Sequence, residues 1–275
     1  MTDDLLKAAV RGGTAEGIKL LVLFDIDGTL STGSKFTESI YAGLKKVFEA
    51  DLGIRLRVDL DELQRRAKRG STLRVRLGEL AKEHGIEPTP DLIERIIGSS
   101  ASHFKKVLAD KPDSIRLLAG AHELLEELCA TDGIAIGVVT NNVSTAMELK
   151  LGHVGLFRLL FRYGQVTNGD EGVSKSNLLK IAHEKGKVRF GSSIRVVYVG
   201  DQVSDVKGGL ENGMFTVAVA TGRNTIEELG EAGASVVLND LEDTRKVIEI
   251  FRELAQADAA RSVGVSAQRP KKVRH

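Results

Sequence analysis

Residues 20–30 read Leu-Leu-Val-Leu-Phe-Asp-Ile-Asp-Gly-Thr-Leu, and they give the first indication of the fold. The apolar run at its start predicts a strand buried on both faces, which is typical of a parallel sheet. Asp25 and Asp27 follow the run, and the repulsion between two carboxylates requires a cation or a proton nearby. Gly28 lets the backbone turn behind them. Because open α/β sheets bind ligands at the carboxyl ends of their strands, we expect the functional site here.

From residue 115 onward, apolar runs alternate with helical patterns, which predicts right-handed crossovers between parallel strands. Further strands are expected at Ile134–Val139, Leu156–Tyr163, Arg195–Val199, Phe215–Ala220 and Ser235–Leu238. Helices are expected at Leu117–Thr131, Ser144–Leu151, Lys175–Lys185, Ile226–Ala232 and Leu241–Leu254. The predicted fold class is therefore α/β, with a doubly wound parallel sheet.

Between residues 31 and 113 the periodicity is helical and contains no convincing strand. Four helices are expected, near Phe36–Ala50, Asp59–Arg69, Thr72–Glu83 and Leu92–Leu108. An all-α insert directly behind the first strand is expected to act as a lid over the site. Its basic residues are Arg65, Arg66, Lys68, Arg69, Arg74 and Arg76. Either one or two of them reach a non-transferred anionic end of a substrate, or the group forms a solvated helix surface.

Three further polar motifs follow strands or loops in the second half of the chain. Thr140-Asn141 follows the second expected strand, Lys175 opens a helix, and Gly200-Asp201 with Asp205 follows the fourth strand. Taken in order with Asp25 and Asp27, these motifs resemble the signatures of the haloacid-dehalogenase-like hydrolases. The resemblance covers about residues 19–252 and implies a Rossmann-like core with a helical cap, similar to phosphoglycolate phosphatases. Ser176 after Lys175 and Ala119 before Gly120 depart from the prolines that the family often has there.

The resemblance also implies a role for each matched residue. Asp25 would be the nucleophile, Asp27 the general acid and base, and Lys175 would fix both the phosphate and Asp25. Thr140 and the backbone N–H of Asn141 would bind phosphoryl oxygens. The resemblance implies Mg²⁺ as the cofactor, held by Asp25, Asp201 and the backbone carbonyl of Asp27, with Asp205 in support. Asp205 could instead cap the following helix, Thr140 could be a strand-edge residue, and Lys175 a surface lysine of its helix.

Charge counting suggests a state for the general acid. Four ionised aspartates would face three positive charges, from Mg²⁺ and Lys175, and the surplus negative charge would oppose an incoming phosphate. A proton on Asp27 would balance the site, and we therefore expect Asp27 to be protonated in the productive complex.

Composition bounds the remaining possibilities. The formal charge of +1 provides no overall attraction to nucleic acid or membranes, and no apolar run approaches the length of a membrane span. Cys129 is the only cysteine, which excludes an intrachain disulfide and a cysteine-rich zinc site. The acidic start of the chain is unlike a secretory signal, so a cytoplasmic location is expected. The expected organisation is a leader at 1–17, an α/β core at 18–30 and 114–255, a helical cap at 31–113 and a disordered basic tail at 256–275.

The function implied by the resemblance is magnesium-dependent hydrolysis of a small phosphorylated metabolite, 2-phosphoglycolate or a similar compound, through an aspartyl-phosphate. The second aspartate argues against dehalogenation, because a halide leaving group needs no proton. A sugar phosphomutase would share the aspartates and remains an alternative. A non-enzymatic binding protein that uses the basic tail is a less favoured one, since every chemical group of the motifs is present. The sequence does not indicate the oligomeric state.

Overall fold

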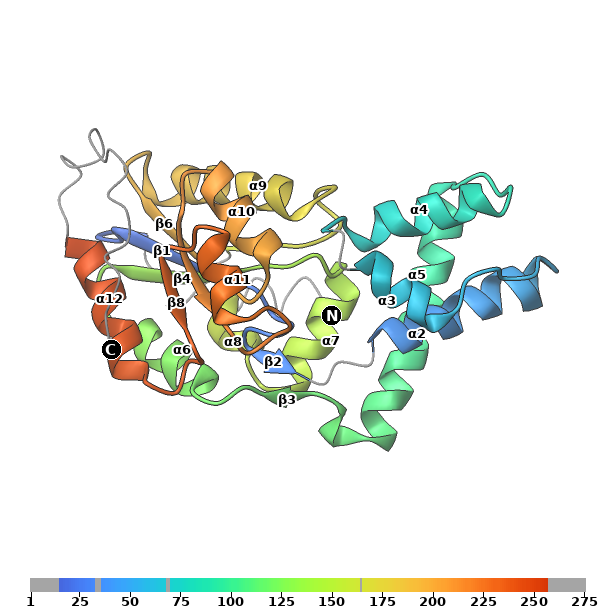
Figure 1. Cartoon of the computed structure of the whole chain (residues 1–275), viewed down its shortest axis with the longest axis horizontal. Coiled ribbons are helices and arrows are strands. Elements are labelled where there is room, and N and C mark those ends of the chain that lie inside the picture. The colour runs from blue at the N-terminus through green and yellow to red at the C-terminus, as the bar shows by residue number, and fades with distance from the viewer. Residues whose placement is uncertain (1–14, 33–35, 68–69, 164, 257–275) are drawn as a thin grey trace.

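The computed structural model describes residues 15–32, 36–67, 70–163 and 165–256. A six-stranded parallel sheet, in the order β5-β4-β1-β6-β7-β8, forms the centre of the α/β part of the molecule. Figure 1 shows this part beside the helical insert. The strands are β1 (Leu20–Phe24), β4 (Ile134–Val139), β5 (Val166–Thr167), β6 (Arg195–Gly200), β7 (Phe215–Val219) and β8 (Val236–Leu238). β1 lies between β4 and β6 with all five residues buried, which confirms the prediction made from its apolar run.

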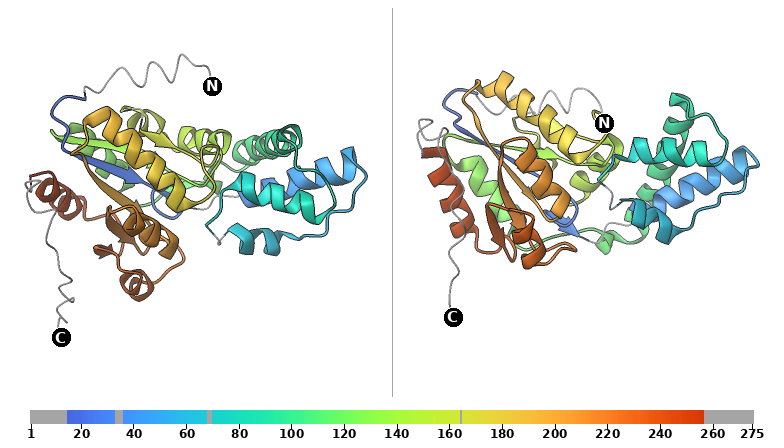
Figure 2. Two further views of the ribbon diagram at one scale, coloured as in Figure 1. Left: turned by 90° about the horizontal axis from the view of Figure 1, so that it is seen from above. Right: turned by 45° about the horizontal axis from the view of Figure 1, so that its top comes forward.

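Helices cover both faces of this sheet (Figure 2). One face packs against α9 (Lys175–Phe190) and α10 (Val203–Glu211), and the other against α6 (Ala121–Ala130) and α12 (Thr244–Gln256). The remaining helices of this part are α7 (Ser144–His153), α8 (Phe157–Leu160) and α11 (Ile226–Glu231). The doubly wound α/β architecture predicted from the sequence is therefore confirmed.

One predicted strand is wrong. The apolar run Leu156–Tyr163 contains the short helix α8, and the strand at that edge of the sheet is β5, which starts at Val166. Leu156 and Leu160 are both fully buried, and their spacing of four residues is that of a helix turn. A short apolar run does not by itself distinguish a strand from a buried helix, and here the helical period decides.

The helical insert forms a second body beside the sheet, with its own apolar core (Figure 1). It comprises α2 (Phe36–Lys45) with its π-helical extension η1 (Lys46–Asp51), α3 (Leu60–Ala67), α4 (Leu73–Glu83), α5 (Pro90–Asp110) and the 3₁₀ turn η2 (Pro112–Ser114). We refer to this body as the cap. An all-α cap was expected, but the stretch predicted to lack strands begins with β2 (Ser31–Thr32), which pairs antiparallel with β3 (Arg116–Leu117). Two residues are too few to produce a recognisable strand pattern.

Local chemistry sets where several helices begin. Thr89 caps α5 by accepting a hydrogen bond from the N–H of Leu92, and Pro90 occupies the first turn, where no N–H is needed. α6 begins at Ala121, later than expected, because Gly120 precedes it with φ of 75°. A side chain on Gly120 would lie 2.0 Å from the carbonyl oxygen of Leu241, so only glycine fits there.

The expected leader and tail lie largely outside the described residues, which start at 15 and end at 256. Within the described residues, no helix combines the length and apolar character that crossing a bilayer requires.

Candidate active site

The site forms at the carboxyl edge of the sheet, where three neighbouring strands end. Asp25 follows β1, Thr140 follows β4 and Asp201 follows β6. The backbone N–H of Asp25 donates a 2.9 Å hydrogen bond to the carbonyl of Val199, so the sheet fixes the start of this loop. Residues more than 170 positions apart in the chain therefore meet at one edge, as the sequence predicted.

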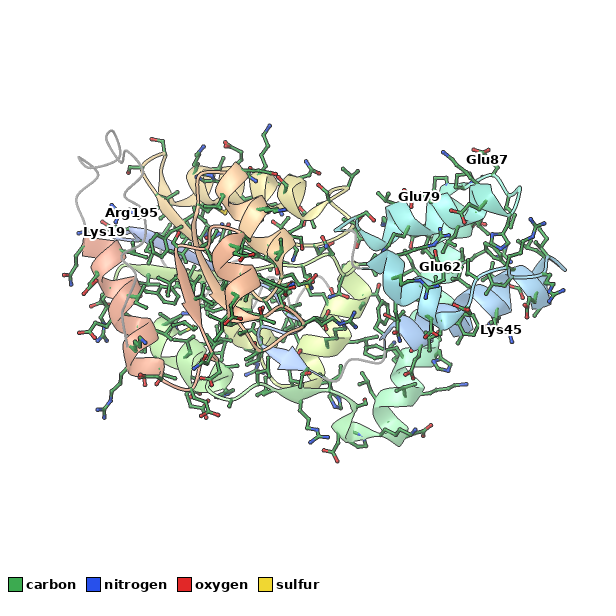
Figure 3. The ribbon with its side chains drawn as sticks, viewed as in Figure 1. Lys19, Lys45, Glu62, Glu79, Glu87 and Arg195 are labelled. Carbon is green, nitrogen blue, oxygen red and sulfur yellow. The ribbon has the colours of Figure 1, made fainter. Side chains whose placement is uncertain are left out.

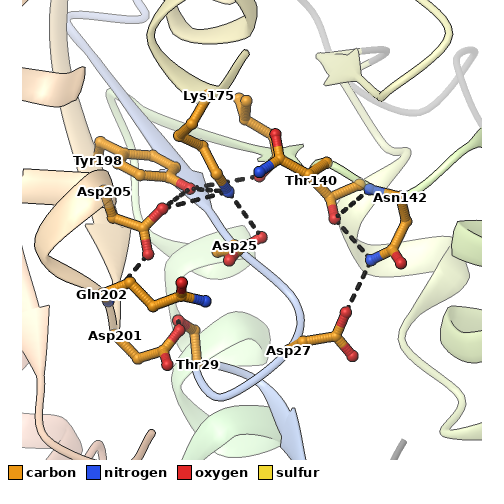
Figure 4. Close-up of polar contacts among 12 residues, drawn as sticks. Asp25, Asp27, Thr29, Thr140, Asn142, Lys175, Tyr198, Asp201, Gln202 and Asp205 are labelled. Carbon is orange, nitrogen blue, oxygen red and sulfur yellow. Dashed lines mark hydrogen bonds and ion pairs between the residues drawn. The ribbon is translucent and has the colours of Figure 1, made fainter. Parts of the chain in front are cut away.

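Lys175 lies at the centre of the site (Figure 4). Its Nζ is 3.1 Å from Oδ1 of Asp25 and 3.2 Å from Oδ1 of Asp205. It also donates a 2.9 Å hydrogen bond to the hydroxyl oxygen of Tyr198, and all four residues are buried. Burial by itself would lower the pKa of Lys175, but the charges of Asp205 and Asp25 outweigh it and raise that pKa. Lys175 is thus an interior cation that bridges two carboxylates, and it is not a surface lysine.

Three carboxylates converge beside this lysine. Oxygens of Asp25, Asp201 and Asp205 lie within 4.8 Å of one another. Burial is the main cause that raises the pKa of Asp25 to about 6 and that of Asp201 to about 8, and repulsion from Asp205 adds to both. Mutually repelling hard oxygen donors are the donor set that Mg²⁺ or a similar divalent cation prefers. The residues present therefore fit the implied magnesium ion.

The position of Asp201 is set by neighbours that leave little free space. The hydroxyl of Thr29 donates to Oδ1 of Asp201 at 3.4 Å. A side chain on Gly28 would lie 2.4 Å from Oδ2 of Asp201, and one on Gly222 would lie 1.7 Å from the same atom. Two glycines therefore make room for this carboxylate.

Asp205 contacts both the start of α10 and Lys175, whereas the sequence left helix capping and metal support as alternatives. Its Oδ2 accepts a 3.0 Å hydrogen bond from the backbone N–H of Gln202, which completes a capping box at the start of α10. Its other oxygen faces Lys175 and accepts a 3.3 Å hydrogen bond from the hydroxyl of Tyr198. The helix cap thus orients the carboxylate toward the site.

Asp27 stands apart from the carboxylate cluster and has a lysine of its own. Nζ of Lys150, from α7, lies 2.6 and 2.7 Å from the two carboxylate oxygens of Asp27, and Nδ2 of Asn142 donates to Oδ2 at 2.8 Å. Burial alone would raise the pKa of Asp27, but Lys150 and the Asn142 hydrogen bond outweigh it and lower that pKa.

The premise of the charge count made from the sequence is therefore wrong, because it omitted Lys150. Asp25, Asp27, Asp201 and Asp205 face two lysines, which leaves a formal charge of −2. A bound divalent cation would neutralise this charge without a proton on Asp27.

The residues expected to bind phosphate line the same space. Thr140 is buried, and its hydroxyl oxygen accepts hydrogen bonds from the backbone and side-chain nitrogens of Asn142 at 3.2 and 2.8 Å. The side-chain amide of Asn141 lies 3.5 Å from the carbonyl of Gly70 in the cap. Both residues line a cavity of about 460 Å³ that also reaches Asp25 and the cap.

The basic residues of the cap divide into distinct groups. Arg65 and Arg66 pair with Glu62, and Arg66 also pairs with Glu83, so these two belong to the paired surface of the cap. Arg74 bridges Glu94 and Asp170. Arg76 lines the cavity. Lys68 and Arg69 lie outside the described residues.

Three residues of the site, Lys150, Tyr198 and Asn142, were not predicted from the sequence, although each leaves a signal there. Lys150 follows Ala146 by four residues and Met147 by three, so it falls on the buried face of a predicted helix. Tyr198 is the one polar side chain within the apolar part of its strand. Asn142 directly follows the matched Thr140-Asn141 pair.

Comparison with known proteins identifies the family. The model of the haloacid dehalogenase-like hydrolases matches residues 22–219, which is most of the described chain. The protein belongs to the haloacid dehalogenase-like hydrolases. This confirms both the family that the sequence motifs indicated and the prediction that the protein is an enzyme of that family. Comparison with curated protein sequences finds no match.

Solved structures of this family share the fold. A hydrolase from Pseudomonas syringae is 20% identical with a TM-score of 0.60, and the match covers 85% of this chain and 99% of that one. A predicted phosphatase from Clostridium acetobutylicum is 24% identical with a TM-score of 0.57, covering 84% and 99%. A protein named as a β-phosphoglucomutase from Bacteroides vulgatus is 18% identical with a TM-score of 0.58, covering 93% and 100%. At these identities the likeness establishes the fold.

Proposed function

We propose that the protein is a magnesium-dependent phosphomonoester hydrolase that acts on a small phosphorylated metabolite through an aspartyl-phosphate. The observation that carries the proposal is the environment of Asp25. Its buried carboxylate is held 3.1 Å from Lys175 at the base of a cavity whose lining includes cap residues. Family membership supports the hydrolase class.

In this proposal Asp25, Asp201 and the backbone carbonyl of Asp27 would hold Mg²⁺, with Asp205 in support. The ion supplies positive charge against the phosphate and the site carboxylates. Lys175 provides the second cation beside Asp25, and Thr140 with the backbone N–H of Asn141 binds phosphoryl oxygens. An anionic nucleophile is thereby able to approach an anionic substrate.

The reaction then proceeds in two displacements. A carboxylate oxygen of Asp25 forms a bond to phosphorus while the bond from phosphorus to the leaving oxygen breaks, and Asp27 gives that oxygen its proton. A water oxygen next forms a bond to phosphorus while the bond from phosphorus to Asp25 breaks, and Asp27 takes a proton from the water. This step releases phosphate and restores the Asp25 carboxylate. In the free site Lys150 and Asn142 hold Asp27 as a carboxylate. The negative charge of the entering phosphate raises the pKa of Asp27 and so favours the proton that the first step needs.

Phosphate release from a panel of phosphorylated metabolites, measured with Mg²⁺ and with a chelator, tests the proposal. Wild-type protein should release phosphate from at least one compound only with the cation, and Asp25→Asn should reduce the rate by about 10⁴-fold or more. Equal rates in the Asp25→Asn variant would refute the nucleophile. Product analysis separates the phosphomutase alternative, because a mutase would yield an isomeric sugar phosphate in place of free phosphate.

A further inference from the structure

We propose that Arg76 is the specificity residue of the cap, and that it binds a second anionic group, a carboxylate or a phosphate, on the part of the substrate that is not transferred. The inference rests on the proposed function, because it places that second anion in the cavity above Asp25. It selects one residue from the basic group of the cap.

The first argument is location. Arg76 lines the cavity that also contains Asp25 and Lys175. The cap contributes Phe36, Thr37, Ile40, Gln64, Leu73 and Arg76 to the lining. Among these described cap residues, Arg76 is the one that carries a charge. The remaining groups are apolar or neutral hydrogen-bonding side chains, so they would enclose a small substrate without neutralising it.

The second argument is that the guanidinium has no protein partner. The structure gives Arg76 no hydrogen bond or ion pair with any described residue, and its Nε is buried without a hydrogen-bond partner. Arg66 and Arg74, by comparison, are each paired with two acids. Leaving a buried donor unsatisfied costs free energy, and an anionic ligand would remove this cost.

The third argument is that the charge persists. Burial lowers the pKa of Arg76 to about 10, and the charge of Glu79 acts in the opposite direction. Glu79 lies on α4, the same helix (Figure 3). Arg76 therefore remains a cation at neutral pH. A guanidinium presents paired N–H donors that match a carboxylate or phosphate edge.

The fourth argument is that the start of α4 is fastened to the core. The hydroxyl of Thr72 donates to the carbonyl of Gly172 at 3.0 Å, and Nε of Arg74 lies 2.6 Å from Oδ1 of Asp170. The backbone N–H of Lys175 donates to the carbonyl of Gly70 at 3.1 Å. Arg76 lies one turn beyond Thr72 and lines the cavity. The segment from Gly70 to Thr72, which contacts the backbone of Lys175, therefore also positions Arg76.

Pairs of substrates that differ in one anionic group provide the test. 2-Phosphoglycolate and ethylene glycol bisphosphate replace the neutral end of 2-hydroxyethyl phosphate with a carboxylate or a phosphate. 2-Phosphoglycerate and glycerol 2-phosphate form a second, larger pair. The variants are Arg76→Met, Arg76→Lys and, as the matched control, Arg65→Met, which removes an exposed cap arginine that pairs with Glu62.

We expect Arg76→Met to lower kcat/KM for the anionic member of at least one pair by roughly tenfold to a hundredfold, the size of one charge-assisted hydrogen-bonded pair. The loss should appear mainly in KM, and the neutral member should change less than about twofold. Arg76→Lys should restore part of the preference, and Arg65→Met should leave it unchanged. If the loss appears with the carboxylate-bearing substrate, Arg76 recognises a carboxylate; if it appears with the bisphosphate, Arg76 recognises a phosphate.

Equal losses for both members of every pair would mean a structural role and overturn the inference, as would no loss at all. If wild-type protein hydrolyses none of these compounds but does hydrolyse another member of the metabolite panel, the proposed function stands, and calorimetric binding to Asp25→Asn protein then decides the role of Arg76. Binding of 2-phosphoglycolate that weakens with Arg76→Met would support it, and absent or unchanged binding would overturn it.

Discussion

The side-chain nitrogen of Lys150 lies 2.6 Å from Oδ2 of Asp27, and the two residues come from different elements of the core. The lysine side chain is 2% exposed, whereas the Asp27 side chain is 38% exposed to the cavity. The pair is therefore asymmetric. Asp27 retains access to water when the lysine is removed. When the aspartate is neutralised, Lys150 keeps, among the described residues, the side-chain oxygen of Asn142 at 3.1 Å and the ring of Phe36, whose centroid lies 5.6 Å from Nζ, and neither is a counter-charge.

This asymmetry predicts an order of stabilities. Asp27→Asn should lower the free energy of unfolding by about 2 kcal/mol, because it leaves a buried ammonium without a counter-charge. Lys150→Met should cost less, and the double variant should recover part of the loss caused by Asp27→Asn. Urea denaturation of the four proteins with a chelator present gives the coupling directly. Additive effects in this cycle would show that the pair contributes no coupling energy.

The pKa values of Asp25 and Asp201 predict how stability depends on pH without a divalent cation. Both are raised above 3.8, to about 6 and about 8. A raised carboxyl pKa means that the folded state holds protons which the unfolded chain releases. The stabilisation from these groups is complete below about pH 4 and is lost as the pH rises through the folded-state pKa values.

We therefore expect the melting temperature in a chelator to fall between pH 5 and pH 8, and Mg²⁺ to raise it most at pH 8. Because other groups titrate in this range, the informative quantity is the difference between wild type and Asp201→Asn. The variant should show a shallower fall and a smaller response to Mg²⁺. If the difference in melting temperature between wild type and Asp201→Asn did not change with pH, this would contradict the raised pKa of Asp201.

Gly222 predicts an effect on metal binding without any loss of a ligand. An added methyl group would lie 1.7 Å from Oδ2 of Asp201, so Gly222→Ala must displace that carboxylate. The expected result is a magnesium affinity at least about tenfold weaker, with the chain still folded. Gly230→Ala is the matched control, because nothing lies within 4 Å of the new methyl group and the position is helical. Equal magnesium affinities for the two variants, measured by calorimetry, would show that Asp201 does not bind the ion.

How much of this site the sequence predicts follows from where each residue lies. Asp25, Thr140 and Asp201 were predictable because an apolar strand precedes each of them, and parallel strands end at one edge. Lys150 and Arg76 lie inside helices, and their roles depend on which neighbour each side chain meets. Arg76 follows Leu73 by three residues and precedes Leu80 by four, so the pattern places it on the inner face of α4. The spacing of apolar residues in α4 does not reveal whether an acidic side chain lies next to Arg76.

The same reasoning explains the errors. The two-residue strand β2 and the short helix α8 depend on tertiary pairing, which overrides local pattern in segments of this length. The charge count that placed a proton on Asp27 was incomplete, because such a count must include every charged neighbour. It omitted Lys150, a lysine eight positions beyond Asn142 that adds one positive charge.

Lys175 provides the last prediction, since it separates structural from catalytic effects by pH. Lys175→Met leaves the buried carboxylates of Asp25 and Asp205 without their shared cation. In a chelator at pH 8 it should lower the free energy of unfolding by about 3–5 kcal/mol. Lys187→Met, on the same helix, removes a partly exposed pair with Glu184 and should cost far less.

At pH 5 the penalty of Lys175→Met should shrink, because protonated carboxyls no longer need the cation. Lys175 lowers the pKa of Asp25, so its removal raises that pKa above about 6, and the relief should begin above pH 6. Phosphate release should stay lost at both pH values, since the proposed mechanism also requires the lysine beside Asp25. Urea titrations at the two pH values, together with the activity assay, check both statements. A stability penalty that does not change with pH would mean that the loss comes from packing of the lysine stem and not from its charge.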